Sequence, residues 1–195
     1  MRQAVCFFPI AVLLVRAQTI DVTPAHVSID EAAAIQVSGC RPGERMTIRA
    51  ELSDGDDGRW VSQSEFIADA HGTVDTSRDA PVAGSYKEAS GMGPVWSMKP
   101  MNSKAGRYIP PRDFGVRRTD FQLMRGATVV STAHLEQAAL AEGIERVTVH
   151  DGSLRGVLFV PPGKGPHPGI LVLGGSEGGM LFGSSSSVRP YCCGP

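Results

Sequence analysis

The stretch "AIQVSGCRPGERMTIRAELSDGDDGRWVSQSEFIAD", residues Ala34–Asp69, alternates apolar with polar residues between short runs of turn formers. The alternating runs are Ala34–Gly39, Arg45–Leu52 and Trp60–Asp69. A strand that buries one face and exposes the other has this period of two. The stretch therefore predicts three half-buried β-strands in succession.

The same pattern continues on both sides of this stretch, from about Ile20 to Gln137. Two further alternating runs are Thr73–Thr76 and Ala127–Gln137, and the turn formers between runs include "RPGE", "SDGDDG" and "DAHG". Several short strands at a spacing of about 8–12 residues favour a sandwich of two sheets. No strong helical stripe competes with this interpretation.

The acidic run Ser53–Gly58, "SDGDDG", has the composition of a calcium loop. A calcium loop of the EF-hand kind needs oxygen ligands at fixed offsets, a terminal bidentate Glu and a helix on each side. Strands flank this run instead. We therefore favour a hairpin loop in which Asp and Gly supply positive φ angles and local side-chain hydrogen bonds.

The segment Pro81–Pro111 is rich in Gly, Pro and Met and has no sustained period. It predicts a long irregular loop pinned by a buried aromatic side chain, because a long loop needs an apolar anchor to offset its ordering entropy. Alternatively, Trp96 and Met98 line a site or fill a contact between two domains.

Beyond Glu142 the pattern changes. Strand-like runs Arg146–His150 and Leu154–Val160 flank an Asp151-Gly152 turn, and the nearly continuous apolar run Ile170–Leu173 follows a Pro/Gly loop. An alternating hairpin followed by an all-apolar strand is typical of the entry to an α/β sheet, whose central strands are buried on both faces.

Composition excludes several classes of protein. The 195 residues are 42% hydrophobic and 20% charged, enough for a globular core, and the net charge of -1 provides no field for nucleic acid or an anionic membrane. The basic clusters Arg45–Arg49 and Arg117–Arg118 are interpreted as solvated strand faces. The four cysteines define neither a metal site nor a disulfide framework. We expect no metal or other cofactor.

The N-terminus has the features of a secretory signal peptide. Arg2 precedes the apolar run Ala4–Val15, and Val15-Arg16-Ala17 gives a small-x-small cleavage pattern. The run is shorter than the roughly 20 residues that span a bilayer, so we expect no membrane span in a mature chain starting near Gln18. The chain is then exported, periplasmic or secreted. The alternative is a cytoplasmic protein in which this run is a buried first strand.

Four segments carry a resemblance to a known family. They are "IDVTPAHVSIDEAAAIQVSGCRPGERMTIRA", "FIADAHGTVDTSRDAPVAGSY", "GMGPVWSMKP" and "RGVLFVPPGKGPHPGILVLGGSEGG", beginning at Ile20, Phe66, Gly91 and Arg155. The chain from Ile20 to Gly179 resembles the acyl-CoA thioester hydrolases and bile acid-CoA:amino acid N-acyltransferases. The resemblance implies an immunoglobulin-like sandwich before an α/β-hydrolase domain. It also implies an acyl-CoA substrate and transfer of its acyl group to water or an amino acid through a Ser or Cys acyl-enzyme.

Ser176 lies in a literal G-x-S-x-G pattern, which in serine hydrolases holds the nucleophile. The acid and the histidine of such a triad follow the nucleophile, but the 19 residues after Ser176 hold no His or Asp and only Glu177 as an acid. An inverted order with His150 or His167 is a formal alternative. We therefore predict no catalytic residue in this chain.

The glycine-rich run after the apolar strand matches the earlier loop that donates an oxyanion-hole N–H in hydrolases. The candidates for this loop are Gly174, Gly175, Ser176 and Glu177. The alternative is a tight strand exit with no chemical role.

The predicted organisation is mainly β: a signal peptide (1–17), an immunoglobulin-like sandwich (18–140), the first strands of an incomplete α/β-hydrolase domain (141–182) and a divergent tail (183–195). The tail has a serine run and no helical period, so we expect the reading frame to depart near Met180–Gly183. The predicted function is that of an acyl-CoA thioester hydrolase family protein without complete catalytic machinery. The alternative is a non-enzymatic, exported β-sandwich binding module.

Overall fold

The computed structural model describes residues 17–101, 107–111 and 114–172, and these residues are mainly β. The elements are β1 Thr19–Thr23, β2 His26–Ser28, β3 Ala34–Ser38, β4 Arg45–Ser53, β5 Arg59–Ile67, β6 Val74–Asp75, β7 Ala83–Gly84, α1 Gly93–Trp96, β8 Lys99–Pro100, β9 Arg117–Arg125, β10 Thr128–Ala138, β11 Glu145–Asp151 and β12 Leu154–Val160. All five strands predicted between Ala34 and Gln137 are confirmed, as β3, β4, β5, β6 and β10.

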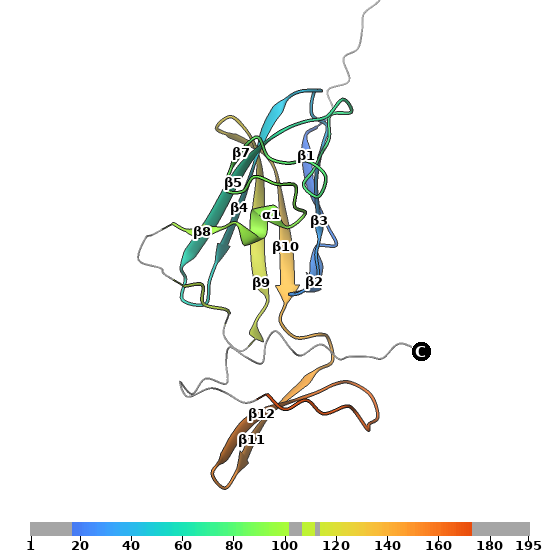
Figure 1. Ribbon diagram of the computed structural model, residues 1–195, viewed down its shortest axis with the longest axis vertical. Coiled ribbons are helices and arrows are strands. Elements are labelled where there is room, and N and C mark those ends of the chain that lie inside the picture. Colours follow the sequence, from blue (N-terminus) through green and yellow to red (C-terminus); the bar gives the residue numbers. More distant parts are fainter. Residues whose placement is uncertain (1–16, 102–106, 112–113, 173–195) are drawn as a thin grey trace, which may run out of the picture.

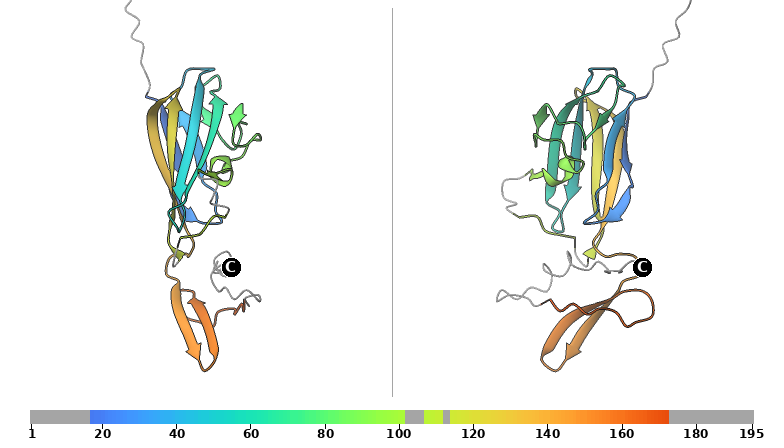
Figure 2. Two further views of the ribbon diagram at one scale, coloured as in Figure 1. Left: turned by 90° about the vertical axis from the view of Figure 1, so that its left-hand side faces the viewer. Right: turned by 45° about the vertical axis from the view of Figure 1, so that its right-hand side comes forward.

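Two sheets pack face to face (Figures 1 and 2). The smaller sheet has the order β1-β3-β6, and the larger has the order β2-β10-β9-β4-β5-β7, with β8 also paired to β5. The backbone N–H of Ile20 in β1 donates to Ser131 Oγ in β10 at 3.2 Å, which joins the two sheets along one side. The predicted mainly β sandwich is confirmed.

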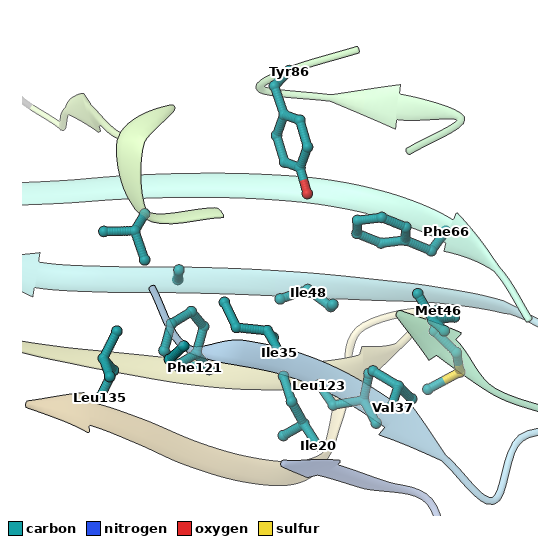
Figure 3. Packing of buried hydrophobic residues seen from close by; sticks show 14 of the residues in the cluster. Ile20, Ile35, Val37, Met46, Ile48, Phe66, Tyr86, Phe121, Leu123 and Leu135 are labelled. Atoms are coloured by element: carbon teal, nitrogen blue, oxygen red, sulfur yellow. The ribbon is translucent and has the colours of Figure 1, made fainter. Parts of the chain in front are cut away.

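The core lies between the sheets (Figure 3). Alternate residues of each long strand point into the core. In β4, for example, buried residues alternate with exposed or half-buried ones. The fully buried side chains of greatest volume are Phe66, Phe121, Ile35, Met46, Ile48, Leu123 and Leu135. Burial of these apolar side chains from both sheets is the main favourable contribution to the fold.

Strand β9 and the N-terminal strands β1 and β2 were not among the predicted runs. β9 lies near the middle of the larger sheet, between β4 and β10, and its Phe121 and Leu123 are fully buried. The regular spacing of Thr119, Phe121 and Leu123 is the sequence signal for this strand, although Arg117 and Arg118 at its start obscure it.

The segment Pro81–Pro111 is largely irregular, as predicted, in its described part, with only β7, α1 and β8 in it. The predicted buried aromatic anchor is Tyr86, which is 5% exposed, whereas Trp96, named in the alternative interpretation, is 62% exposed. The reason is the single turn of α1, which directs Gly93 to Val95 to the core and Trp96 outward. A Cβ on Gly93 would lie 2.3 Å from the Tyr86 ring, so this close contact requires glycine.

The hairpin of β11 and β12 forms a separate two-stranded sheet, with register from Glu145 opposite Val160 to Asp151 opposite Leu154. Both strands and the turn agree with the prediction, and Gly152 provides a φ of 55° at the start of the two-residue loop. The apolar strand predicted at Ile170–Leu173 is not formed by its described residues. Ile170, Leu171 and Val172 are 66%, 83% and 49% exposed, because no neighbouring strand in the described chain pairs with them.

Candidate functional site

The predicted oxyanion-loop residues, Gly174, Gly175, Ser176 and Glu177, lie outside the described residues. The two histidines weighed as partners for Ser176 are described, and both are exposed. His150 faces Arg155 across the hairpin near its turn, and His167 lies in the Pro/Gly loop after β12.

An open cleft of about 510 Å³ lies on the outer face of the larger sheet, near the ends of β4 and β9. No motif or pattern in the sequence indicates this cleft. Its lining residues are Glu51, Leu52, Ser53, Asp54, Arg59, Pro111, Val116, Arg118, Asp120 and Gln122. Pairing of β4 with β9 brings these distant segments together, with Glu51 directly opposite Asp120.

The charges in this cleft are paired with one another. Arg59 Nε donates to Glu51 Oε1 at 2.7 Å, and Arg49 Nη2 lies 3.3 Å from Glu51 Oε2. Arg118 donates to Asp120 at 3.0 Å and to Glu136 at 3.3 Å. Two carboxylates directly opposite each other on neighbouring strands repel, and the flanking guanidiniums offset this repulsion. Within the two basic clusters, the side chains of Arg45 and Arg118 are 63% and 53% exposed, as expected for solvated strand faces, whereas that of Arg49 is only 29% exposed.

One wall of the cleft is the loop between β4 and β5, the run considered as a calcium loop. Asp54 Oδ1 accepts hydrogen bonds from the backbone N–H of Asp56 (3.0 Å) and Gly58 (2.7 Å), and Oδ2 accepts one from Trp60 Nε1 (3.0 Å). Burial raises the pKa of Asp54, but these hydrogen bonds outweigh it and hold the pKa below its usual range. The prediction of a hairpin loop is confirmed; Asp57 supplies its positive φ, 61°.

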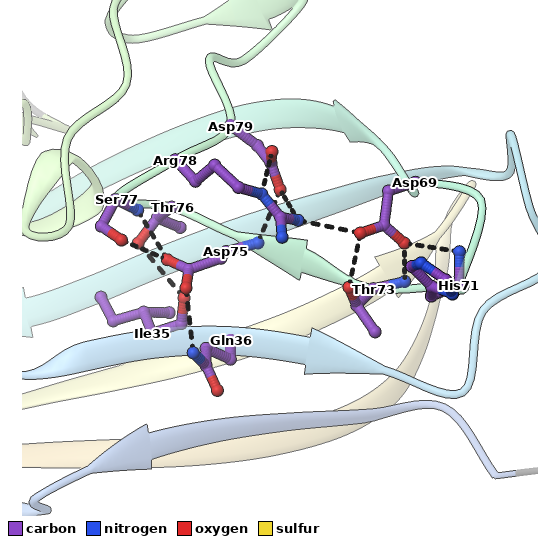
Figure 4. Close-up of polar contacts among 10 residues, drawn as sticks. All are labelled: Ile35, Gln36, Asp69, His71, Thr73, Asp75, Thr76, Ser77, Arg78 and Asp79. Atoms are coloured by element: carbon purple, nitrogen blue, oxygen red, sulfur yellow. Dashed lines mark hydrogen bonds and ion pairs between the residues drawn. The ribbon is translucent and has the colours of Figure 1, made fainter.

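A second polar cluster surrounds the turn between β5 and β6 (Figure 4). Asp69 accepts hydrogen bonds from the backbone N–H groups of His71 and Thr73 and from the Thr73 hydroxyl. Arg78 Nη2 lies 2.9 Å from Asp69 and 2.8 Å from Asp79. The backbone and hydroxyl hydrogen bonds of Thr73 contribute most to lowering the pKa of Asp69 to about 2. These hydrogen bonds close the turn between β5 and β6.

This cluster predicts an acid dependence of stability. The folded pKa of Asp69 lies below its reference value of 3.8, so the charged carboxylate stabilises the fold above about pH 4, and this contribution is lost as the pH falls towards about 2. We expect Asp69→Ala to lower the thermal midpoint near neutral pH, and the difference from wild type to shrink in acid. Thermal denaturation followed by circular dichroism across this pH range measures both.

The control for this prediction is Glu88→Gln, which removes an exposed carboxylate from the loop after Tyr86. It should leave the midpoint close to that of wild type near neutral pH. A difference between wild type and Asp69→Ala that stays constant from neutral pH to about pH 2 would show that the charge of Asp69 contributes nothing.

The described residues hold neither a metal-binding cluster nor a membrane-spanning helix. Within residues 17–101, 107–111 and 114–172, no three His, Cys, Asp or Glu side chains are grouped so that they could hold a metal ion. The same part of the chain contains no helix of the length and apolarity needed to cross a bilayer.

Comparison with known proteins gives the family. The profile described as "Acyl-CoA thioester hydrolase/BAAT N-terminal region" matches residues 30–151, more than half of the chain. The chain belongs to the acyl-CoA thioester hydrolase/BAAT family. The matched residues run from just before β3 to the end of β11, so they include most of the sandwich. The resemblance seen in the sequence is confirmed.

Curated relatives agree with this assignment. The chain is 33% identical over 168 residues to bile acid-CoA:amino acid N-acyltransferase of Homo sapiens, covering 82% of this chain and 40% of that protein. It is 32% identical over 169 residues to acyl-coenzyme A thioesterase 5 of Mus musculus, covering 84% and 40%. It is also 32% identical over 172 residues to peroxisomal succinyl-coenzyme A thioesterase of Mus musculus, covering 85% and 40%. The chain thus spans about 40% of the length of these acyl-CoA enzymes.

Proposed function

We propose that this chain is the N-terminal sandwich of a protein that transfers acyl groups from CoA thioesters to water or to an amino acid. The observation that carries the proposal is the family match over residues 30–151, together with relatives named as acyl-CoA thioesterases and N-acyltransferases. The sandwich, which we place at residues 18–140, serves as a scaffold.

We further propose that the 195 residues perform no acyl transfer by themselves. A Ser nucleophile needs a base within hydrogen-bond reach and a third group that orients the base. No His or Asp follows Ser176 in the sequence, and His150 and His167 are exposed. We assign Gly174–Glu177 to an oxyanion loop, whose backbone N–H groups would stabilise the negative oxygen that develops when a thioester carbonyl is attacked.

The experiment is an assay of free CoA released from short-, medium- and long-chain acyl-CoA by the purified chain, with and without glycine or taurine as acceptor. We expect the rate of the protein-free blank, with no change in Ser176→Ala. Mouse acyl-coenzyme A thioesterase 5 is the positive control. Turnover above the blank that Ser176→Ala abolishes would contradict the proposal.

A second candidate function, a non-enzymatic binding module, is favoured by the open cleft on the outer face of the larger sheet, over β4 and β9. It predicts saturable binding of a small ligand that Arg118→Ala weakens, with no acyl-CoA turnover.

We also propose that the protein is exported, because residues 1–17 have the features of a secretory signal peptide. Mass spectrometry of the secreted chain should then give an N-terminus near Gln18.

A further inference from the structure

We infer that the Phe114 side chain fixes the orientation of the β11–β12 hairpin relative to the sandwich. The hairpin lies beyond the ends of β9 and β10 in both figures that show the whole fold (Figures 1 and 2).

The hairpin belongs to neither sheet of the sandwich. Its two strands pair only with each other in the described part of the chain. A connection of six residues, 139–144, joins it to β10, and the one backbone hydrogen bond within this connection runs from Ile144 N–H to Ala141 C=O at 3.3 Å. A short connection of this kind limits distance but leaves direction free, so a non-covalent contact must set the direction.

The Phe114 ring supplies such a contact. Its centroid lies 5.1 Å from that of Phe159, with the planes at 87°, and the Arg146 Cζ atom lies 5.5 Å from the Phe114 centroid. Edge-to-face aromatic pairs and guanidiniums over an aromatic ring are both attractive arrangements. Arg146 and Phe159 are directly opposite each other in the hairpin register, so one ring contacts both strands on the same face.

The sandwich holds the chain on both sides of Phe114. Before it, the backbone N–H of Gly55 donates to Ile109 C=O at 2.7 Å, and the Tyr108 ring packs edge-on to Trp60 with centroids 5.8 Å apart. After it, Arg117 begins β9. The Phe114 ring is therefore presented to the hairpin from two points that are fixed to the sandwich.

The backbone of Phe114 is in the left-handed region, with φ 58°. A bulky side chain rarely adopts this region, and such a conformation persists only where the surroundings enforce it. The surroundings here are the anchors at Ile109 and Arg117 and the ring contacts with the hairpin. Residues 161–172 continue from the end of β12. The contact at Phe114 therefore also sets the direction in which these residues leave the hairpin.

Residual dipolar couplings of the full-length, ¹⁵N-labelled chain test the inference. In wild type, amides of the sandwich and of the hairpin should fit a single alignment tensor. In Phe114→Ala the hairpin amides should need a tensor of their own with a reduced magnitude, while their protection from exchange shows that β11 and β12 stay paired. Phe114→Trp, which keeps an aromatic ring, should restore the single tensor.

Leu158→Ala is the matched control, because it shortens an apolar side chain on the opposite face of β12 from Phe159. It should keep the single tensor. Phe159→Ala removes the same contact from the hairpin side with the sandwich sequence intact, so it covers the case in which Phe114→Ala fails to fold. A single tensor in either Phe114→Ala or Phe159→Ala, or independent tensors already in wild type, would overturn the inference.

Discussion

Replacing Phe121 with alanine is expected to lower the free energy of unfolding by about 3–5 kcal/mol. The side chain is fully buried in β9, and the strand register places Ala50 of β4 and Ala133 of β10 beside it. These small neighbours cannot fill the space that the ring leaves, so the substitution costs both the burial of the ring and a cavity. Urea denaturation followed by circular dichroism gives the difference in free energy.

Gln122→Ala is the control for this substitution, because Gln122 is the next residue of β9 and points to the outer face. Its effect should stay within about 0.5 kcal/mol, as for most surface substitutions. A loss below about 1.5 kcal/mol for Phe121→Ala would mean that the core closes over the missing ring, against the packing described above.

Gly72→Ala is expected to cost about 2–4 kcal/mol, from a strained backbone and a steric clash together. Gly72 has φ 73°, and a Cβ atom there would lie 2.0 Å from the carbonyl oxygen of Cys40. The backbone at this point cannot shift freely, because Cys40 N–H donates to Gly72 C=O at 3.0 Å. Thermal and urea denaturation measure the loss.

Gly126→Ala separates the two contributions. Gly126 has φ 60°, a similar conformation, but a Cβ there meets nothing within 4 Å. This variant should therefore lose only about 1–2 kcal/mol, the cost of a left-handed backbone for a residue with a Cβ. Equal losses at the two positions would show that the contact with Cys40 plays no part.

Much of the sandwich could be predicted because apolar and polar residues alternate along a half-buried strand. β3, β4 and β5 alternate cleanly, and turn formers separate them. The β11–β12 hairpin could also be predicted, from its two alternating runs and the turn at Gly152 between them. At β9 only the charged start, Arg117 and Arg118, was interpreted as part of a strand face, and the alternating residues that follow it were not predicted as a strand.

The loop before β8 shows the limit of reasoning from residue type. Both Tyr86 and Trp96 are large aromatic residues in an irregular segment, and only one of them is buried. The outcome depends on the direction in which α1 points its side chains, and four residues of helix carry no periodicity that could reveal it. The exposed Trp96 ring still makes a defined contact, because its Nε1 donates to Ser90 Oγ at 3.0 Å.

The open cleft could not be predicted, because it depends on strand register. Its lining comes mainly from the end of β4, the start of β5 and the first half of β9, and only the pairing of β4 with β9 brings Glu51 opposite Asp120. The predicted strand at Ile170–Leu173 failed for a related reason. An all-apolar run becomes a strand only when neighbouring strands cover it, and the described residues provide none for Ile170–Val172.

A chimera tests most directly the claim that this chain is the sandwich of an acyl-CoA enzyme. Residues 30–151 would replace the matching segment of mouse acyl-coenzyme A thioesterase 5, and released CoA would be measured. We predict that the chimera hydrolyses acyl-CoA and that Phe121→Ala within it lowers the temperature at which activity is lost. A chimera that is folded by circular dichroism and monodisperse, but releases no CoA, would contradict the account.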